Sequence, residues 1–122
     1  MNIVIDAFGG DNAPLEVIKG AIDAQKDFNI DITLVGDEET IKKCAGENSL
    51  DISKLKIKHA ATVIDICEEP TSVIKNKKDC SMAVGMQMLA DGEGDAFVSA
   101  GSTGALVVGA TFIVKRLKGI KR

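Results

Sequence analysis

The chain has 122 residues, of which 45% are hydrophobic, 3% aromatic and 27% charged, and its formal net charge is -3. This length fits a single domain with an aliphatic core, and the clear apolar periodicity argues against disorder. The slightly acidic balance provides no general attraction to nucleic acid, so we expect no nucleic-acid partner. Three cysteines without a CxxC pair and one histidine do not form a metal-ligating cluster, so we expect no metal site.

The first half of the chain alternates strand and helix patterns. Pro14 can occupy the first turn of a helix, where its missing N–H has no cost, and the apolar residues up to Ala24 follow at helical spacing. The predicted elements are a strand at 2–6, a glycine-containing turn at 9–12, the helix of Pro14, a strand at 32–35, a helix at about 38–45 and a partly exposed strand at 55–59.

The second half continues this pattern. Asp79 and Ser81 are N-cap candidates for a helix through Leu89, and Met82 and Met86 share one face of that helix, which we expect in the core. The other predicted elements are β-rich residues at 62–66 that extend or flank the third strand, a short helix from Pro70 to Ile74, a buried strand at 95–99 and a long apolar helix ending near Leu117.

Strands that alternate with helices predict an α/β fold with a mainly parallel sheet and right-handed crossovers. We find no linker, repeat or low-complexity segment, so residues 1–122 are expected to form one α/β domain. The longest apolar stretch, 105–114, is shorter than the roughly 20 residues that span a bilayer. No secretory signal precedes the first strand, and reduced thiols are the simplest interpretation, so a soluble cytoplasmic protein is predicted.

The loop after the first predicted strand contains Asp6, Gly9, Gly10 and Asp11. Ligands of open α/β sheets bind outside the carboxyl ends of the strands, and glycine allows a backbone to approach a ligand closely. Because carboxylates repel phosphate, we predict that Asp6 and Asp11 orient other groups and do not contact an anion. The alternative is that Asp11 or Asn12 only caps the following helix.

Residues 99–104 (SAGSTG) are the best anion-site candidate. They join a strand to a helix start, where free backbone N–H groups and the helix dipole favour negative charge, and the hydroxyls of Ser102 and Thr103 add donors. Gly101 and Gly104 complete this predicted phosphate cradle. The segment is neither a Walker loop nor a GxGxxG motif. The alternative is an N-cap at Ser102 or Thr103 with glycines for close packing.

Lysines at 75–78 precede the helix start, and lysine binds phosphate as a point charge. Lys78 is the favoured acting lysine, with Ser81 as a further phosphate contact, although a solvated basic face is the simpler interpretation. The thiol of Cys80 lies at a helix start, but no neighbouring base is visible, so a structural role is favoured. His59 could be a general base, but without a recognisable partner it is interpreted as structural.

Taken together, four stretches resemble the acyl-carrier-protein-dependent phosphate acyltransferases of bacterial phospholipid synthesis, the PlsX family. They are IDAFGGDNAP at 5–14, LVGD at 34–37, KKDCSM at 77–82 and VSAGSTGA at 98–105. The resemblance covers the whole chain in order. The family usually has methionine at position 8, histidine at 12, serine at 80 and asparagine at 102, where this chain has Phe8, Asn12, Cys80 and Ser102.

The resemblance implies a three-layer α/β/α sandwich, Rossmann-like and similar to isocitrate and isopropylmalate dehydrogenases. It implies an enzyme that forms acyl-phosphate from acyl-carrier protein and inorganic phosphate, without a metal or other cofactor. It also implies a homodimer, peripheral membrane association, and a native chain well over twice this length, of which this would be the N-terminal part. The lysines at 75–78 are a candidate docking surface for the acidic carrier protein.

Two alternatives remain open. One is a phosphotransacetylase-like enzyme that acts on short acyl-CoA. The other is a non-catalytic fragment that binds an anion or the carrier protein. A nucleotide-binding role is disfavoured, because no acidic residue stands about 20 positions after a GxGxxG motif.

Overall fold

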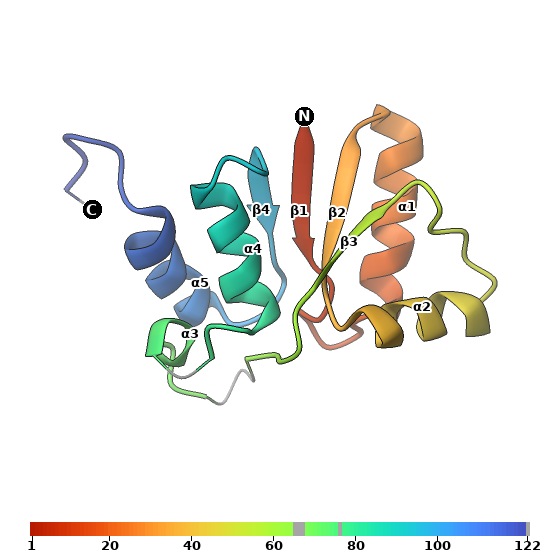
Figure 1. Ribbon diagram of the computed structural model, residues 1–122, viewed down its shortest axis with the longest axis horizontal. Coiled ribbons are helices and arrows are strands. Elements are labelled where there is room, and N and C mark those ends of the chain that lie inside the picture. Colours follow the sequence, from red (N-terminus) through yellow and green to blue (C-terminus); the bar gives the residue numbers. More distant parts are fainter. Residues whose placement is uncertain (65–67, 76, 122) are drawn as a thin grey trace.

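The computed structural model describes residues 1–64, 68–75 and 77–121. A four-stranded sheet in the order β3-β2-β1-β4 forms its centre (Figure 1). The elements in chain order are β1 (Asn2–Asp6), α1 (Leu15–Phe28), β2 (Asp31–Gly36), α2 (Glu38–Glu47), β3 (Lys56–His59), α3 (Ser72–Lys75), α4 (Ser81–Ala90), β4 (Ala96–Val98), α5 (Thr103–Gly109) and the π-helical η1 (Ala110–Val114).

All three strand pairings are parallel, as the alternation of strands and helices predicts. β1 lies inside the sheet and pairs with β2 from Asn2↔Asp31 to Asp6↔Val35, and with β4 on its other side. Because every strand runs in the same direction, the carboxyl ends of all four meet at one edge. The loops that follow β1 and β4 are therefore neighbours there.

Helices cover both faces of the sheet, which confirms the three-layer α/β/α arrangement. In β2, Ile32 and Leu34 point to the face covered by α1 and α2, where they join Ile18 and Ile41 in one apolar cluster. Alternate residues point to the other face, where Val35 packs with Val4 and with Met88 of α4. This period of two is the sequence pattern of a sheet that is buried on both sides.

A further apolar cluster lies beside the sheet, where α4 meets α3 and α5 (Figure 1). Met82 and Met86 are 3% and 2% exposed in this cluster, so their predicted core position is confirmed. Gly109 of α5 allows the close approach, because an added Cβ would lie 2.3 Å from the Met86 sulfur. The core is aliphatic and thioether-rich, as the composition predicts.

Two predictions about helix ends are wrong. The N-cap of α4 is Cys80, whose sulfur accepts from the Ala83 N–H at 3.3 Å, and neither Asp79 nor Ser81 takes this position. The last helix ends at Val114, because its final turn widens into a π-helix and Lys115 adopts a positive φ of 72°. Helical spacing in the sequence continues past this point but does not reveal the change of hydrogen-bond pattern.

The interpretation of residues 95–99 as a buried strand is also wrong. β4 forms one border of the sheet in the described part of the chain, and Val98 is 52% exposed. Thr62 does flank the sheet region by a single bridge to Cys80, while residues 65 and 66 of the predicted β-rich segment lie outside the described residues. Within the described ranges, no helix is long and apolar enough to cross a membrane.

Candidate functional site

The loops that follow β1 and β4 touch each other at the carboxyl edge of the sheet. Their contact is made by Gly9 and Gly101: a Cβ added at Gly9 would lie 2.8 Å from the Gly101 nitrogen and 2.7 Å from Ser99 Oγ. A Cβ added at Gly101 would lie 3.3 Å from the Gly9 Cα. Two glycines are therefore needed because two backbones meet here.

Asp6 joins these loops to the start of α4. Its side chain is 3% exposed, and its Oδ1 accepts from Ser81 Oγ at 2.6 Å and from the Phe8 N–H at 3.1 Å. Its Oδ2 accepts from Ser99 Oγ at 2.8 Å, and Ser99 Oγ in turn accepts from the Gly101 N–H at 3.1 Å. A buried carboxyl group with this many donors fixes the positions of three separate segments.

A cleft of about 230 Å³ opens between the two loops. Gly10 and Asp11 line it on the β1 side, Gly101 and Ser102 on the β4 side, and Val63 and Ile64 complete the wall. Gly10 has a φ of +107°, a conformation that side chains of L-residues rarely adopt. The volume of the cleft is below that of typical pockets for drug-sized ligands, so the cleft suits a small ion or a single reacting group.

Ser102, which lines the cleft, stands at the start of α5. Ser102 is the N-cap and accepts from the Ala105 N–H at 3.2 Å. No hydrogen bond between described residues engages the N–H groups of Ser102, Thr103 and Gly104. The first N–H groups of a helix have no intrahelical acceptor, so these amides can donate to an anion. Both sequence interpretations of this loop, N-cap and anion cradle, are compatible with the geometry.

The remaining predicted site residues divide between the cleft and other places. Asp11 lines the cleft and Thr103 is exposed beside it. Gly104 packs against another loop, since an added Cβ would lie 2.8 Å from Pro70 Cγ. Ser81 is 1% exposed and its hydroxyl donates to Asp6, so in this structure it supports the loops from behind.

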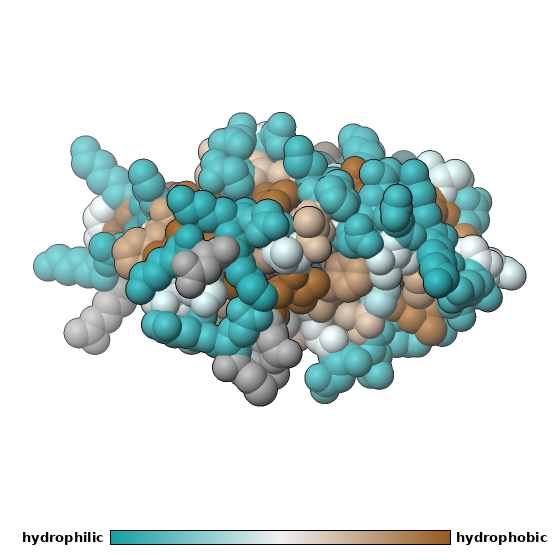
Figure 2. Space-filling view, turned by 60° about the horizontal axis from the view of Figure 1, so that its bottom comes forward, coloured by the Kyte–Doolittle hydropathy of each residue, from teal (hydrophilic) through white to brown (hydrophobic). Residues whose placement is uncertain are grey.

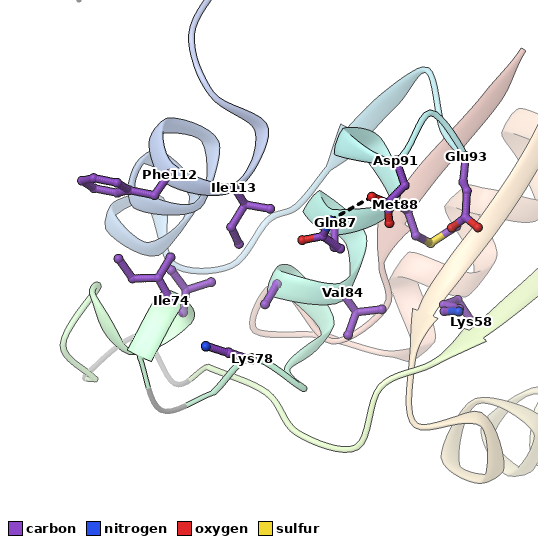
Figure 3. Close-up of a pocket in the computed structure, with 12 residues that line it drawn as sticks. Lys58, Ile74, Lys78, Val84, Gln87, Met88, Asp91, Glu93, Phe112 and Ile113 are labelled. Carbon is purple, nitrogen blue, oxygen red and sulfur yellow. Dashed lines mark hydrogen bonds between the residues drawn. The ribbon is translucent and has the colours of Figure 1, made fainter.

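Lys78 does not line the cleft. It lies at the mouth of a separate hollow beside α4 (Figure 3). Its neighbour Lys77 contacts Glu68 at 2.5 Å and the Val63 carbonyl at 3.0 Å. The predicted lysine thus belongs to a neighbouring surface and not to the cleft.

Cys80 lies next to Ser81 and is completely buried. Burial raises the pKa of its thiol, which also faces the negative charges of Asp6 and Asp79, and two backbone N–H groups only partly oppose this shift. The thiol therefore stays protonated at neutral pH and acts as a helix cap. The structural role favoured by the sequence fits this environment.

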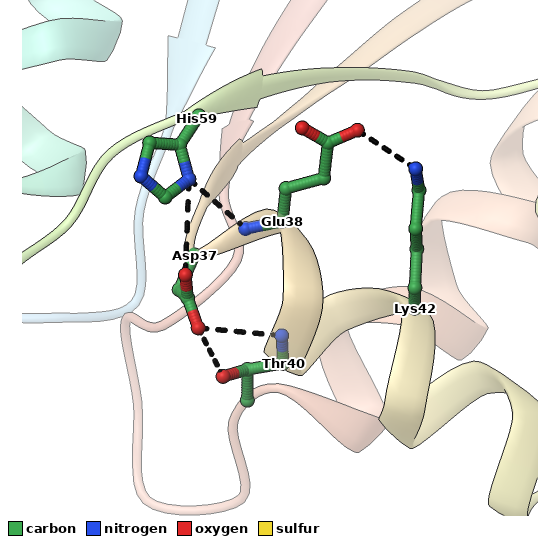
Figure 4. Close-up of polar contacts among 5 residues, drawn as sticks. All are labelled: Asp37, Glu38, Thr40, Lys42 and His59. Carbon is green, nitrogen blue, oxygen red and sulfur yellow. Dashed lines mark hydrogen bonds and ion pairs between the residues drawn. The ribbon is translucent and has the colours of Figure 1, made fainter.

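The other half of the same sheet edge contains a polar cluster that sequence reasoning missed (Figure 4). His59, at the end of β3, accepts from the Glu38 N–H at 3.3 Å through Nδ1, which lies 3.7 Å from Asp37 Oδ1. Asp37 caps α2 by accepting from the Thr40 N–H at 3.3 Å, and the Thr40 hydroxyl bonds to the same oxygen. The structure brings these residues together because Gly36 pairs with His59 at the ends of β2 and β3.

This combination of a parallel sheet between two helical layers and a glycine-lined cleft at the carboxyl edge defines an α/β protein of the Rossmann-like class. The EutD phosphotransacetylase of Staphylococcus aureus has the same fold, with a TM-score of 0.69 over all of this chain and 40% of that one, at 23% sequence identity. At this identity the likeness concerns the fold alone.

The chain belongs to the fatty acid synthesis protein family, whose model matches residues 1–122. It is 46% identical to a phosphate acyltransferase of Acetivibrio thermocellus, 47% to one of Caldanaerobacter subterraneus and 42% to one of Clostridioides difficile. Each match covers all of this chain and 36% of the relative, so the chain spans about a third of the length of these curated relatives. The family resemblance seen in the sequence is confirmed.

Proposed function

We propose that this chain provides the phosphate-binding part of a phosphate acyltransferase that converts acyl-carrier protein and inorganic phosphate to acyl-phosphate and free carrier protein. Membership of the fatty acid synthesis protein family and the similarity to phosphate acyltransferases support this proposal. The observation that carries it is the loop after β4, in which the N–H groups of Ser102, Thr103 and Gly104 have no acceptor among the described residues.

The proposed reaction transfers the acyl group from the sulfur of the carrier protein to an oxygen of phosphate. A phosphate oxygen attacks the thioester carbonyl carbon and forms a C–O bond, which gives a tetrahedral oxyanion. The oxyanion collapses, the C–S bond breaks and the electron pair leaves on the carrier sulfur. The proton lost by the attacking phosphate ends on this thiolate. Holding phosphate beside the thioester and stabilising the developing oxyanion are the tasks of the protein.

Several predicted residues have a defined place in this proposal, whereas the Gly101 N–H donates to Ser99 Oγ and Lys78 lies outside the cleft. The amides of Ser102, Thr103 and Gly104, with the Thr103 hydroxyl, hold phosphate. Asp6 orients the two glycine loops through its bonds to Ser81 and Ser99 and does not touch the anion. Asp11 lies on the opposite side of the cleft, where its charge limits how deeply a phosphate can enter.

The finer expectations from the resemblance stay proposals that the family supports: a carrier-protein partner, a homodimer, a cytoplasmic location and peripheral association with a membrane. The phosphotransacetylase-like alternative differs in substrate. Comparing dodecanoyl-carrier protein with acetyl-CoA, each at several phosphate concentrations, separates the two activities. Faster phosphate-dependent turnover of acetyl-CoA would contradict the proposed function.

Phosphate binding itself can be tested on this chain. In a titration followed by amide NMR, we expect saturable shifts at Ser102, Thr103 and Gly104 with phosphate but not with chloride at equal ionic strength. Thr103→Val should weaken phosphate binding by about tenfold, the effect of one charge-assisted hydrogen bond.

Thr111→Val is the matched control, because Thr111 is exposed on the same helical segment and its hydroxyl donates to the Val107 carbonyl. This variant should bind phosphate as the wild type does. Equal phosphate affinity in all three proteins, or shifts confined to other loops, would remove the β4 loop from the mechanism.

A further inference from the structure

A second hollow lies away from the two glycine loops, along the outer side of α4 (Figure 3). It measures about 470 Å³, roughly twice the volume of the cleft. Its wall is mainly aliphatic, with Ile74 of α3, Val84 and Met88 of α4, and Ile113 of η1. Five of the twelve lining residues are polar, namely Lys58, Lys78, Gln87, Asp91 and Glu93, and the apolar wall between them suits an apolar ligand.

α4 has an unusual composition for a helix that borders such a hollow. None of its ten residues, SMAVGMQMLA, is charged, and only Ser81 and Gln87 are polar. Ser81 is turned toward Asp6, which leaves Gln87 as the exposed polar side chain. A helix that is apolar on all sides is normally covered on all sides. In α4 only Gln87 and Ala90 are exposed, and of these two Gln87 lines the hollow.

The hollow follows α4 from one edge of the sheet to the other. Lys78 marks its beginning, near the start of α4 that Ser81 ties to the carboxyl end of β1. Asp91 and Glu93 mark its end, and the Glu93 carbonyl accepts from the Asn2 side chain at the amino end of β1. A ten-residue helix is about 15 Å long, which is comparable to an extended medium-length fatty acyl chain.

We propose that this hollow, called the α4 groove, binds the fatty acyl chain of the thioester substrate. The inference rests on the proposed function and extends it to the position of the acyl group. The cleft between the glycine loops is too small for a fatty chain, whereas the groove starts at the same edge of the sheet and is lined by flexible aliphatic and thioether groups.

The charges at the rim support an uncharged occupant. Lys58 and Lys78 are balanced by Asp91 and Glu93, so the groove does not select an acidic or a basic peptide. Figure 2 shows apolar surface near the middle of the face turned toward the viewer, with hydrophilic side chains around it. The thioester end of the chain would lie at Lys78, near the start of α4.

The test uses pantetheine thioesters of increasing chain length as probes, with binding measured by calorimetry and methyl NMR. Dodecanoyl-pantetheine should bind at least tenfold more tightly than butanoyl-pantetheine and should shift the methyl signals of Met88, Ile74 and Ile113. This follows because each buried methylene adds a nearly constant increment to the binding free energy. Equal affinity for both probes, or shifts that avoid these methyl groups, would overturn the proposal.

Gln87→Trp fills the groove from an exposed position without changing the core. It should weaken dodecanoyl-pantetheine binding at least tenfold. Gln25→Trp is the matched control, because Gln25 borders a different hollow between α1 and residues 49–55. The same loss in both variants, or in neither, would contradict a binding site along α4.

The amide signals of residues 102–104 report phosphate in the same samples, so the two proposals can fail separately. Phosphate shifts without methyl shifts would overturn the groove proposal alone. Methyl shifts without phosphate shifts would support the groove while removing the phosphate loop. If the methyl signals shift with protein concentration in the absence of a probe, and sedimentation shows self-association, then the groove is covered by a second copy of the protein. This result would overturn the proposal.

Discussion

Asp6 and Asp37 stand at the carboxyl ends of neighbouring strands, but their surroundings differ. Asp6 is buried and accepts hydrogen bonds from Ser81, Ser99 and the Phe8 N–H, which come from three segments of the chain. The Asp37 side chain is 39% exposed and bonds only to groups close to it, in α2 and at the end of β3. The buried carboxylate of Asp6 thus joins distant segments, whereas the exposed one of Asp37 organises the start of its own helix beside the end of β3.

The largest expected effect is that of Asp6→Ala. The substitution leaves the buried hydroxyl of Ser81 without its acceptor and releases both glycine loops, so we expect a loss of about 3 kcal/mol in the free energy of unfolding. Urea denaturation at pH 7 measures this loss. A loss below about 1 kcal/mol would show that the hydrogen bonds to Asp6 do not stabilise the fold. Asp6 and Asp37 would then contribute equally to the free energy of unfolding.

Gly9→Ala tests the contact between the two loops. The new methyl group would lie within 2.9 Å of Ser99 Oγ, the Gly101 nitrogen and Asp6 Oδ2, and we expect a loss of about 2 kcal/mol together with weaker phosphate binding. Gly20→Ala is the control, since a Cβ at Gly20 in α1 meets no atom within 4 Å. This change should raise stability by about 1 kcal/mol. Similar effects in both variants would contradict a tight contact at Gly9.

Asp37→Ala should have a moderate effect. It removes the N-cap of α2 but leaves no buried donor, so we expect a loss of about 1 kcal/mol in urea denaturation. Asp37→Asn, which can still accept from the Thr40 N–H, should recover most of the stability. Phosphate binding should not change in either variant. A loss as large as that of Asp6→Ala would show that the two halves of the edge are equally important for folding.

The smallest effect concerns pH and the exposed pair beside Asp37. The hydrogen bond and charge of Lys42, 2.9 Å away, lower the pKa of the Glu38 carboxyl below 4.5. A lowered pKa in the folded state contributes stability above pH 4.5 that is lost as the pH falls through the folded value. Glu38→Gln should therefore lower the melting temperature slightly at pH 7 and not at pH 3. Equal shifts at both pH values would exclude this pair as the cause.

Much of the fold could be predicted from local sequence. Each of the patterns used involves only residues that are close in sequence, so it can be recognised without the structure. Examples are the apolar run that ends at Asp6, the turn at Gly9 and Gly10, and the strand pattern of β2. The exposure of Val98 could not be predicted in this way. An apolar run has the same sequence pattern in a central strand as at the border of the sheet, and only the strand order decides between them.

The loops of the candidate site could be predicted from the sequence, but the distant residues that hold them through hydrogen bonds could not. Small residues at 99–104 identify a close backbone approach, whereas the hydrogen bond from Ser81 to Asp6 joins residues 75 positions apart. Lys78 is adjacent to the start of α4 in sequence, yet it lies at the α4 groove because the turn before Cys80 directs it there. The role of the Cys80 sulfur as N-cap was missed because aspartate and serine, which stand on either side of it, are much commoner at N-caps than cysteine.

The long reach of the Asp6 network has a consequence for biosynthesis. Its bond to Ser99 spans 93 positions, so the two glycine loops cannot be joined until β4 has been made and has paired with β1. A nascent chain that lacks this strand has the first loop but not its partner. The contact between the two loops and the pairing of β1 with β4 thus form together, and an anion bound between the loops, as proposed, would stabilise this paired state in proportion to its occupancy.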